Sequence, residues 1–443
     1  MSLWTESRIT LKLALPLVIG QVSQMLLGVA DTVMLGKLGV TELAVLTFTN
    51  SLFYLPFVFG IGVLTPISVF TSNARGADDP SAGRMSCRHG FQIATIIGLV
   101  LALLFCALTP FLHLFNQPPA VVARTPVFYL LIMVSMMPAL MSIGLKNHAD
   151  AMDRPWPAFW IFLGGVLLNV FLNWVLIYGN LGAPRMGLEG AGWATLISRC
   201  LIVVAMLVWL NQSKILAEWV PQRWLSCPTS SEVRRFFSVG VPASIQMTCE
   251  VAAFSAAALL MGRFGEVSMA AHQIALMCAA TAFMVPLGLS MALSVRVGEA
   301  EGREASASLR PIVLSGWLIA AGWSGISALI FLTAGGILAS WFSEEAFVVS
   351  LAAKILVVVG VFQIVDSLQV ASSSMLRGLY DTQIPAVIGF FSYWMMGIPL
   401  AFFLSVFLDW KAVGVWWGLA FGLAIACFSL CWRLWRKTDF RPA

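Results

Sequence analysis

Long apolar runs separated by short polar segments dominate the chain. A membrane-spanning helix needs about 20 mostly apolar residues, and about twelve runs reach that length. They are residues 10–34, 43–71, 91–115, 124–146, 159–179, 190–211, 233–261, 267–296, 311–334, 348–376, 384–408 and 413–435. A spanning strand would instead show alternation over about ten residues. The pattern therefore predicts an all-α integral membrane protein with twelve transmembrane helices.

The composition agrees with this prediction. Of the 443 residues, 59% are hydrophobic and only 11% are charged, whereas soluble domains average about 25% charged residues. The eight cysteines form no C-x-x-C pair, and Cys106, Cys278 and Cys427 lie inside apolar runs. They are expected to act as small hydrophobic residues rather than as disulfide or metal ligands. The first apolar run continues past residue 30 without a small-residue cleavage site, so we expect no cleavable signal peptide.

The basic residues are distributed unevenly between alternate connecting segments. If the N-terminus is cytoplasmic, the segments outside hold only Lys37, Arg124, Arg185, Arg263 and Lys411. Apart from Arg199 and Lys354, whose positions are ambiguous, the other basic residues fall inside. This bias favours twelve spans with both termini in the cytoplasm. It also explains the net charge of +5 without nucleic-acid binding, which we do not expect.

The two halves of the chain repeat each other. A shift of 226 residues places Pro16 on Pro242 and aligns G-K-L-G at 36–39 with G-R-F-G at 262–265. Six spans per half give both halves the same orientation, as in transporters whose substrate site lies between two parallel repeats. We predict an N-lobe at residues 1–211, a cytoplasmic inter-lobe linker at 212–231, and a C-lobe at 232–443.

Three carboxylates interrupt the apolar runs. An ionised side chain at the bilayer centre costs about 2.5–3.5 kcal/mol on insertion scales, yet Asp31, Glu250 and Asp366 all lie within predicted spans. The repeat does not duplicate them, because Asp31 falls opposite Ala257 and Glu250 opposite Gln24. We interpret the three as proton- or cation-coupling groups. The alternative is that each carboxylate only hydrogen-bonds neighbouring helices.

Four motifs in order resemble one transporter family. They are V-A-D-T at 29–32 after Pro16, G-A-G-x-A-T at 190–195, A-A-H-Q-I-A-L at 270–276, and L-R-G-x-x-D-T at 376–382. Together they resemble the multidrug and toxic compound extrusion (MATE) family, and most closely its NorM-type branch. The resemblance implies two six-helix lobes related by a pseudo-two-fold axis around a V-shaped cleft. It also implies export of bulky, often cationic compounds in exchange for protons or sodium ions.

The resemblance also assigns residues. It implies coupling roles for Asp31, Glu250 and Asp366, with sodium at the last two as an alternative to a proton. The same family pattern points to a polar network of Asn169, Asn173 and Thr195, for which interhelical packing is the other interpretation. The family often shows Tyr where Phe362 stands. The missing hydroxyl favours a proton as the coupling ion.

Other residues could line a substrate cleft. Soft thioethers and aromatic rings suit varied flat cations, and the candidates are Gln246, His272, Met277, Met284, Phe362 and Tyr393. The plainer interpretation is that such residues face lipid or pack in the core. The expected partners are small-molecule drugs, lipophilic cations and the lipid bilayer. We expect a monomer of the bacterial inner (plasma) membrane with no cofactor beyond the coupling ion.

Three other classes of protein remain as alternatives. A lipid-linked oligosaccharide flippase of the same superfamily would need a basic cavity, for which Arg199 is the one plausible residue. A membrane-embedded enzyme would need a nucleophile with its base or a set of metal ligands, and neither H-E-x-x-H nor G-x-S-x-G is present. A channel is the third alternative, but the parallel repeat with asymmetric acids favours coupled transport.

Overall fold

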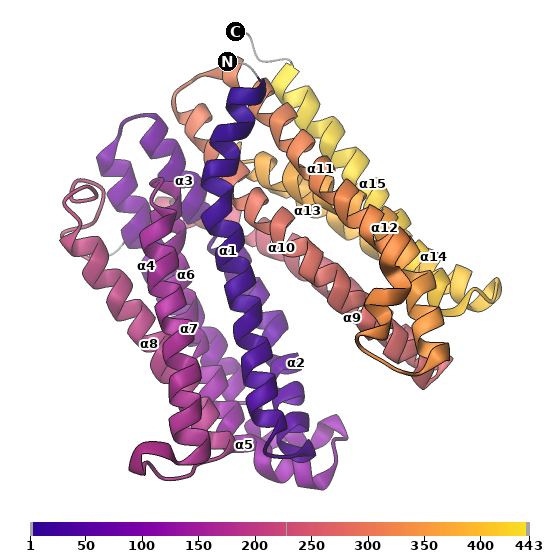
Figure 1. Cartoon of the computed structure of the whole chain (residues 1–443). Helices are drawn as coiled ribbons and strands as arrows, with labels where there is room; N and C mark the ends of the chain where they lie inside the picture. Colours follow the sequence, from indigo (N-terminus) through magenta and orange to yellow (C-terminus); the bar gives the residue numbers. More distant parts are fainter. Residues whose placement is uncertain (1–2, 227, 440–443) are drawn as a thin grey trace. The chain divides into compact units, whose positions relative to one another are not determined.

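The computed structural model describes residues 3–226 and 228–439, and this part of the chain contains helices and no β-strand (Figure 1). Twelve helical segments are long and apolar enough to cross a membrane, as predicted. Nine of them are built on one main helix each: α1 (Leu3–Gly36), α4 (Pro80–Cys106), α7 (Pro155–Tyr178), α8 (Leu188–Gln212), α9 (Ser230–Met261), α10 (Glu266–Gly302), α11 (Ser306–Ser340), α12 (Ala346–Gly378) and α15 (Lys411–Asp439). The predicted fold class is confirmed.

The other three spans are interrupted. The second consists of α2 (Val40–Val63) and α3 (Thr65–Gly76), and the fourth of α5 (Pro119–Val134) and α6 (Met136–Ala151). Leu64 and Ser135 stand at these two breaks. Pro66 and Pro138 follow shortly after, and proline lacks the N–H that would continue the helical hydrogen bonding. The eleventh span comprises α13 (Gln383–Phe390), the π-helix η4 (Phe391–Gly397), α14 (Ile398–Phe402) and the π-helix η5 (Phe403–Phe407).

The third span shows where hydrophobicity gave the wrong limits. The sequence predicts a span at residues 91–115, but α4 begins at Pro80 and ends at Cys106. Asp79 caps its start by accepting hydrogen bonds from the backbone N–H groups of Ser81 and Ala82. This cap, with Pro80 at the first helical position, stabilises a helix start among polar residues. The apolar residues Thr109–Phe115 form the short 3₁₀ helix η1 instead. The remaining 3₁₀ segments are η2 (Asn180–Gly182) and η3 (Gly262–Phe264).

The backbone supports the internal repeat. Gly39 and Gly265, 226 positions apart, both have positive φ, at 155° and 88°. Asp78 and Glu304 share the same spacing and also have positive φ, at 52° and 54°. Helices α3 and α10 end at Gly76 and Gly302, again 226 residues apart. The two halves therefore share loop geometry as well as sequence.

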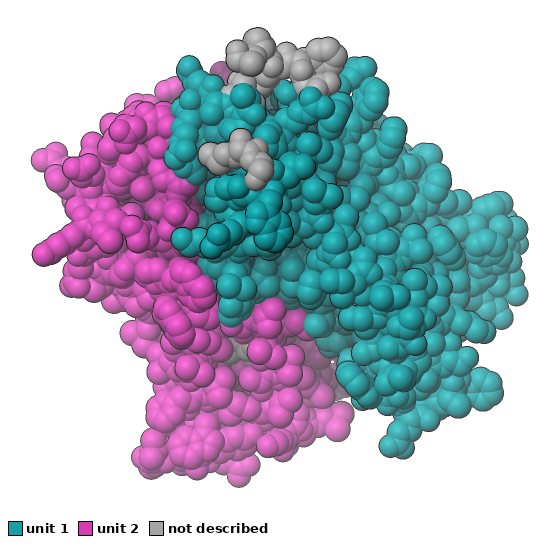
Figure 2. All heavy atoms as spheres, turned by 45° about the horizontal axis from the view of Figure 1, so that its top comes forward, with its two compact units in different colours: residues 1–21, 241–443 teal, residues 22–240 magenta. Residues whose placement is uncertain are grey.

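The helices form two compact units (Figure 2). Unit 1 contains residues 1–21 and 241–443, and unit 2 contains residues 22–240. Each unit has its own apolar core, built around residues such as Ile355, Val359 and Trp416 in unit 1 and Ile67, Tyr129 and Met136 in unit 2. The unit limits fall inside α1 and α9, so both helices belong to both units. The lobes predicted from the repeat stay a prediction.

The first segments of α1 and α9 pack tightly in their respective units. In unit 1, a Cβ atom on Gly288 of α10 would lie 2.7 Å from the Cα atom of Val18 in α1. In unit 2, a Cβ atom on Gly240 of α9 would lie 2.5 Å from the carbonyl oxygen of Val63 in α2. Real Cβ atoms do not come so close to backbone atoms, so both positions require glycine. Such close approach of helix backbones is typical of packing in membranes.

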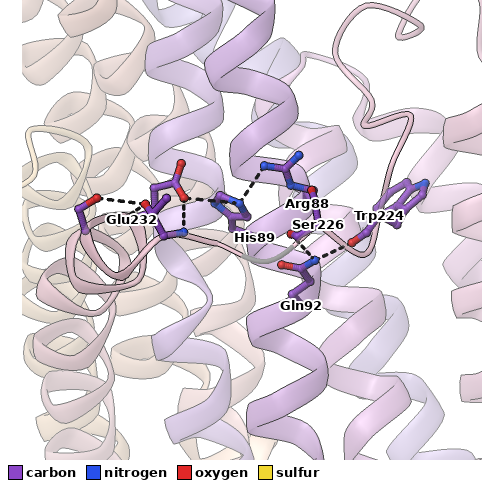
Figure 3. A network of polar contacts seen from close by, with 8 residues as sticks. Arg88, His89, Gln92, Trp224, Ser226 and Glu232 are labelled. Carbon is purple, nitrogen blue, oxygen red and sulfur yellow. Dashed lines mark hydrogen bonds and ion pairs between the residues drawn. The ribbon is translucent and has the colours of Figure 1, made fainter.

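The connector between the two halves is docked on α4 within unit 2. Gln92 of α4 donates hydrogen bonds to the carbonyl oxygens of Trp224 and Ser226, at 2.7 and 3.0 Å (Figure 3). Glu232 accepts from the backbone N–H of Thr229, which caps α9, and lies 3.8 Å from His89. These contacts fix the start of α9 against α4, so the predicted linker is ordered over its described residues.

Candidate functional site

Asp31 meets polar side chains of α7 and α8 in unit 2. The amide nitrogen of Asn173 donates to Asp31 Oδ1 at 2.6 Å and also to Asn169 Oδ1 at 3.1 Å. Asn169 and Asn173 lie one helical turn apart, so both side chains project from the same face of α7. The structure thus brings together the acid and the two asparagines that the sequence singled out.

The second row of this network comes from α8. Asn169 lies 3.4 Å from Thr195 Oγ1 and 3.3 Å from Ser198 Oγ. In this orientation the Asn169 nitrogen donates to Ser198. With the amide turned, the nitrogen would lie 3.2 Å from Asp31 Oδ1 and the oxygen would accept from Ser198 instead. Both asparagines are buried and Asp31 is partly buried. The ionised acid therefore has donors in an otherwise apolar helix bundle, and such hydrogen bonds stabilise its charge.

Arg199, left unassigned by the sequence, belongs to the same region. Its Nη1 donates to Ser135 Oγ at 2.7 Å, and its guanidinium lies 5.0 Å from the ring centre of Phe53. The opposite charges of Arg199 and Asp31 attract each other. No direct ion pair joins them within the described residues. We call Asp31, Asn169, Asn173, Thr195, Ser198 and Arg199 the Asp31 site.

The other two acids lie in unit 1. Glu250 is on α9 and Asp366 is on α12, and the negative charge of Glu250 acts on Asp366. Their direct contact stays a prediction. Asp366 is only 6% exposed. Arg377, at the end of α12, provides the positive charge that acts on Glu250. We call Glu250, Asp366, Arg377 and Tyr393 the Glu250–Asp366 site.

Tyr393 reaches this site from the π-helix η4. Its side chain is 3% exposed, and its hydroxyl faces Glu250 without meeting strict hydrogen-bond geometry with any described residue. Pro399 explains the irregular helix, because it lacks an N–H and its ring crowds the carbonyl group of Met395. Widening into π turns relieves that clash and rotates the preceding side chains. Such π turns occur frequently at functional sites.

The residues predicted to line a substrate cleft fall into two groups. Phe362, His272 and Tyr393 are each 3% exposed, and Gln246 is 6% exposed. Gln246 exchanges hydrogen bonds with Ser373, at 2.8 and 3.1 Å. Met277 is 40% exposed and Met284 is partly buried. Most of these residues are therefore buried within unit 1, and their contact with substrate stays a prediction.

Aromatic rings enclose part of the Glu250–Asp366 site. Phe362, one helical turn before Asp366, packs edge-on against Phe254 and Trp416, with ring centres 5.8 Å apart in both pairs. His272 lies 5.6 Å from Trp416, and neither of its ring nitrogens has a hydrogen-bond partner among the described residues. Apolar rings lower the local dielectric around the buried Asp366 and so strengthen electrostatic interactions there.

The sequence analysis missed two members of these sites, Arg377 and Ser198, and also Ser135, the hydrogen-bond partner of Arg199. It treated Arg377 only as a cytoplasmic topology residue, but the structure places its charge beside Glu250. It did not select Ser198 or Ser135. Arg377 lies in the L-R-G-x-x-D-T motif, which was a usable signal. The two serines gave no signal in the sequence, because serine is common in apolar helices and only the packing of the helices shows its hydrogen-bond partners.

The fold and the two buried acid sites define a polytopic membrane transport protein built from two repeats. A family model described as MatE matches residues 16–175 and 242–403. The chain belongs to this family, the multidrug and toxic compound extrusion family, as its motifs indicated.

Relatives of known name and similar solved structures support this family assignment. The chain is 33% identical to a "Probable multidrug resistance protein NorM" of Xylella fastidiosa (strain 9a5c), covering 97% of this chain and 92% of that protein. It is 32% identical to the "Multidrug resistance protein PmpM" of Pseudomonas aeruginosa, covering 98% and 92%. Among solved structures, the fold is similar to the Vibrio cholerae MATE transporter VcmN in the bent form, with a TM-score of 0.88, 20% identity and coverage of 98% and 97%. It is also similar to the eukaryotic MATE transporter AtDTX14, with a TM-score of 0.85, 20% identity and coverage of 98% of both chains.

Proposed function

We propose that this protein is a secondary active multidrug efflux antiporter. It exports organic, often cationic and amphipathic, compounds in exchange for protons entering the cell. The names of its relatives support the multidrug substrate class. The twelve spans support a membrane location, and we propose the bacterial inner membrane with both termini in the cytoplasm.

The observation that carries the choice of ion is the charge of the Glu250–Asp366 site. Two ionised carboxylates and one guanidinium leave a net charge of −1, with Asp366 buried and Glu250 partly buried. Neighbouring carboxylates in an apolar site do not both stay ionised, and one of them takes up a proton. The site therefore becomes neutral when it binds one proton, and we propose that this proton is the one exchanged.

The proposed cycle uses this change of charge. Protonation from the outside neutralises the site, and a neutral site can be desolvated at lower cost than a charged one. The protein then closes outside and opens inside, and the proton leaves to the cytoplasm. One pH unit supplies about 1.36 kcal/mol per proton, and 100 mV adds about 2.3 kcal/mol per charge moved. One proton can thus drive a tenfold gradient of a neutral drug.

Sodium is the second candidate ion. Three oxygen atoms on the helices that carry the acids, Thr248 Oγ1, Ser367 Oγ and Gln369 Oε1, are buried without hydrogen-bond partners among the described residues. Hard cations bind several oxygen ligands. Phe362, which has no hydroxyl, supplies none and favours the proton.

The test is ethidium transport into or out of vesicles with proton and sodium gradients imposed separately. We expect a proton gradient to drive transport in the absence of sodium. Asp366→Asn, which removes one carboxylate of the site that takes up the proton, should reduce transport to the level of vesicles lacking the protein. Asp409→Asn is the matched control, because it removes a carboxylate whose side chain is 79% exposed. Undiminished transport by Asp366→Asn, or transport driven by neither gradient, would refute the proposal.

A further inference from the structure

Arg199 is the positively charged group of the Asp31 site, and the proposed proton exchange at the Glu250–Asp366 site assigns it no role. It lies near the middle of a membrane-spanning helix, where a charged side chain is costly unless its surroundings compensate. The positive charge of Arg199 is stabilised by a hydrogen bond to Ser135 and by two aromatic rings. Ser135 is fully buried and donates its own hydroxyl proton to the carbonyl oxygen of Ile132 at 2.7 Å. Its oxygen lone pair is therefore directed to accept from Arg199.

Aromatic rings hold the other side of the guanidinium. Phe53 and Phe57 of α2 stack on each other with ring centres 4.8 Å apart, and Arg199 lies 5.0 and 6.0 Å from the two centres. A guanidinium over an aromatic face is attracted by the ring. The same ring faces would attract an organic cation. Arg199 thus occupies a position that a cationic substrate could otherwise take.

We propose that Arg199 is a built-in counter-cation that sets the cation affinity of the Asp31 site and so determines specificity. With Asp31 ionised, the pair has a net charge of zero. Without Arg199 the same site would have a charge of −1 and two uncovered aromatic rings, which together form a strong site for organic cations. A site that binds its cargo too tightly releases it slowly. Arg199 weakens binding enough for release, and this inference rests on the proposed transport function.

The proposal predicts an order of affinities set first by net charge and, at equal charge, by whether Arg199 covers the aromatic rings. Arg199→Gln leaves −1, the unmodified protein and the double variant Asp31→Asn/Arg199→Gln each leave zero, and Asp31→Asn leaves +1. The affinity for a monovalent organic cation should fall in that order. A purely structural role would instead group both variants that lack Arg199 together, because both lose the contacts with Ser135 and Phe53.

The experiment is a calorimetric titration of the purified full-length protein in lipid nanodiscs with tetraphenylphosphonium. This ion keeps its charge at every pH. Arg199→Gln should bind it about tenfold more tightly than the unmodified protein, which corresponds to about 1.4 kcal/mol. Arg199→Lys should stay near the unmodified protein because it keeps the charge. Triphenylphosphine oxide, an uncharged compound of similar shape, should not follow the order.

Arg185→Gln is the matched control, since Arg185 is exposed and lies outside the site. Removing its charge should leave the affinity unchanged. The proposal is overturned if Arg199→Gln binds the cation no more tightly than the unmodified protein, or if no variant binds it. Failure of ion-driven transport in vesicles, with the predicted order of affinities intact, would refute the antiport and leave the role of Arg199 standing.

Discussion

The two acid sites of this protein compensate the charge of their carboxylates in different ways. The Asp31 site has one carboxylate, one guanidinium and several donors, with Asn173 at 2.6 Å. The Glu250–Asp366 site has two carboxylates and one guanidinium, and Tyr393 faces it without a strict hydrogen bond. The first is balanced while its acid is ionised, and the second is balanced only after one proton or cation has bound. A buried site with an unbalanced charge is the better place for an exchangeable ion.

The difference follows from where each arginine comes from. Arg199 lies within α8, donates a hydrogen bond to Ser135, and is the counter-charge of one acid. Arg377 lies at the end of α12, contacts Met247 Sδ at 3.9 Å, and is the counter-charge of a site with two acids. The repeated backbone therefore hosts two unlike sites. This specialisation is consistent with one site that exchanges the ion and another that holds the organic substrate.

The largest effect should come from removing the single cation of the more acidic site. Arg377→Gln leaves the buried Asp366 and the partly buried Glu250 without a counter-charge, and breaking a buried charge pair costs about 3–5 kcal/mol. Thermal unfolding in detergent should show a much lower midpoint than for Arg199→Gln, which leaves one acid with its donors. The loss should shrink as the pH falls, because the acids then take up protons. Equal losses for the two variants would contradict the comparison.

An intermediate effect should come from making the first site resemble the second. Asn173→Asp would give the Asp31 site two carboxylates and one guanidinium. At a pH high enough to keep both carboxylates ionised, the affinity for tetraphenylphosphonium should rise about tenfold, or by about 1.4 kcal/mol, and at lower pH a bound proton should reduce the gain. The same titration measures it. Asn116→Asp, at an exposed position, is the control and should change nothing. An unchanged affinity in Asn173→Asp would show that net charge does not govern this site.

The smallest effect should come from restoring a hydroxyl beside Asp366. Phe362→Tyr adds an oxygen one helical turn from the acid, in a position 3% exposed, at a cost of about 1–3 kcal/mol if the buried hydroxyl is left without a partner. We expect transport to persist and to gain a sodium-dependent component. The vesicle assay with separate gradients measures this, and Phe254→Tyr, on the ring that Phe362 contacts, is the matched control. A sodium response as large in Phe254→Tyr would show that the position beside Asp366 is not special.

Much of the fold could be predicted because bilayer physics acts on local sequence. In lipid, a helix satisfies its backbone hydrogen bonds within itself. Each run of about 20 apolar residues therefore predicts a span without any information about the other helices. The errors lie where local chemistry competes with hydrophobicity. Asp79 and Pro80 start α4 earlier than its apolar residues suggest, and Pro399 accompanies π turns rather than a simple bend.

The sequence by itself determined the twelve spans, the repeat, and the three acids that must be compensated inside the membrane, because each follows from the cost of exposing charge or backbone to lipid. Only the tertiary structure decided which groups compensate them. Asn173 meets Asp31 from 142 residues away, and Arg199 finds Ser135 across 64 residues. Such pairs depend on how helices rotate and pack against each other, and no local pattern of apolar residues records that rotation.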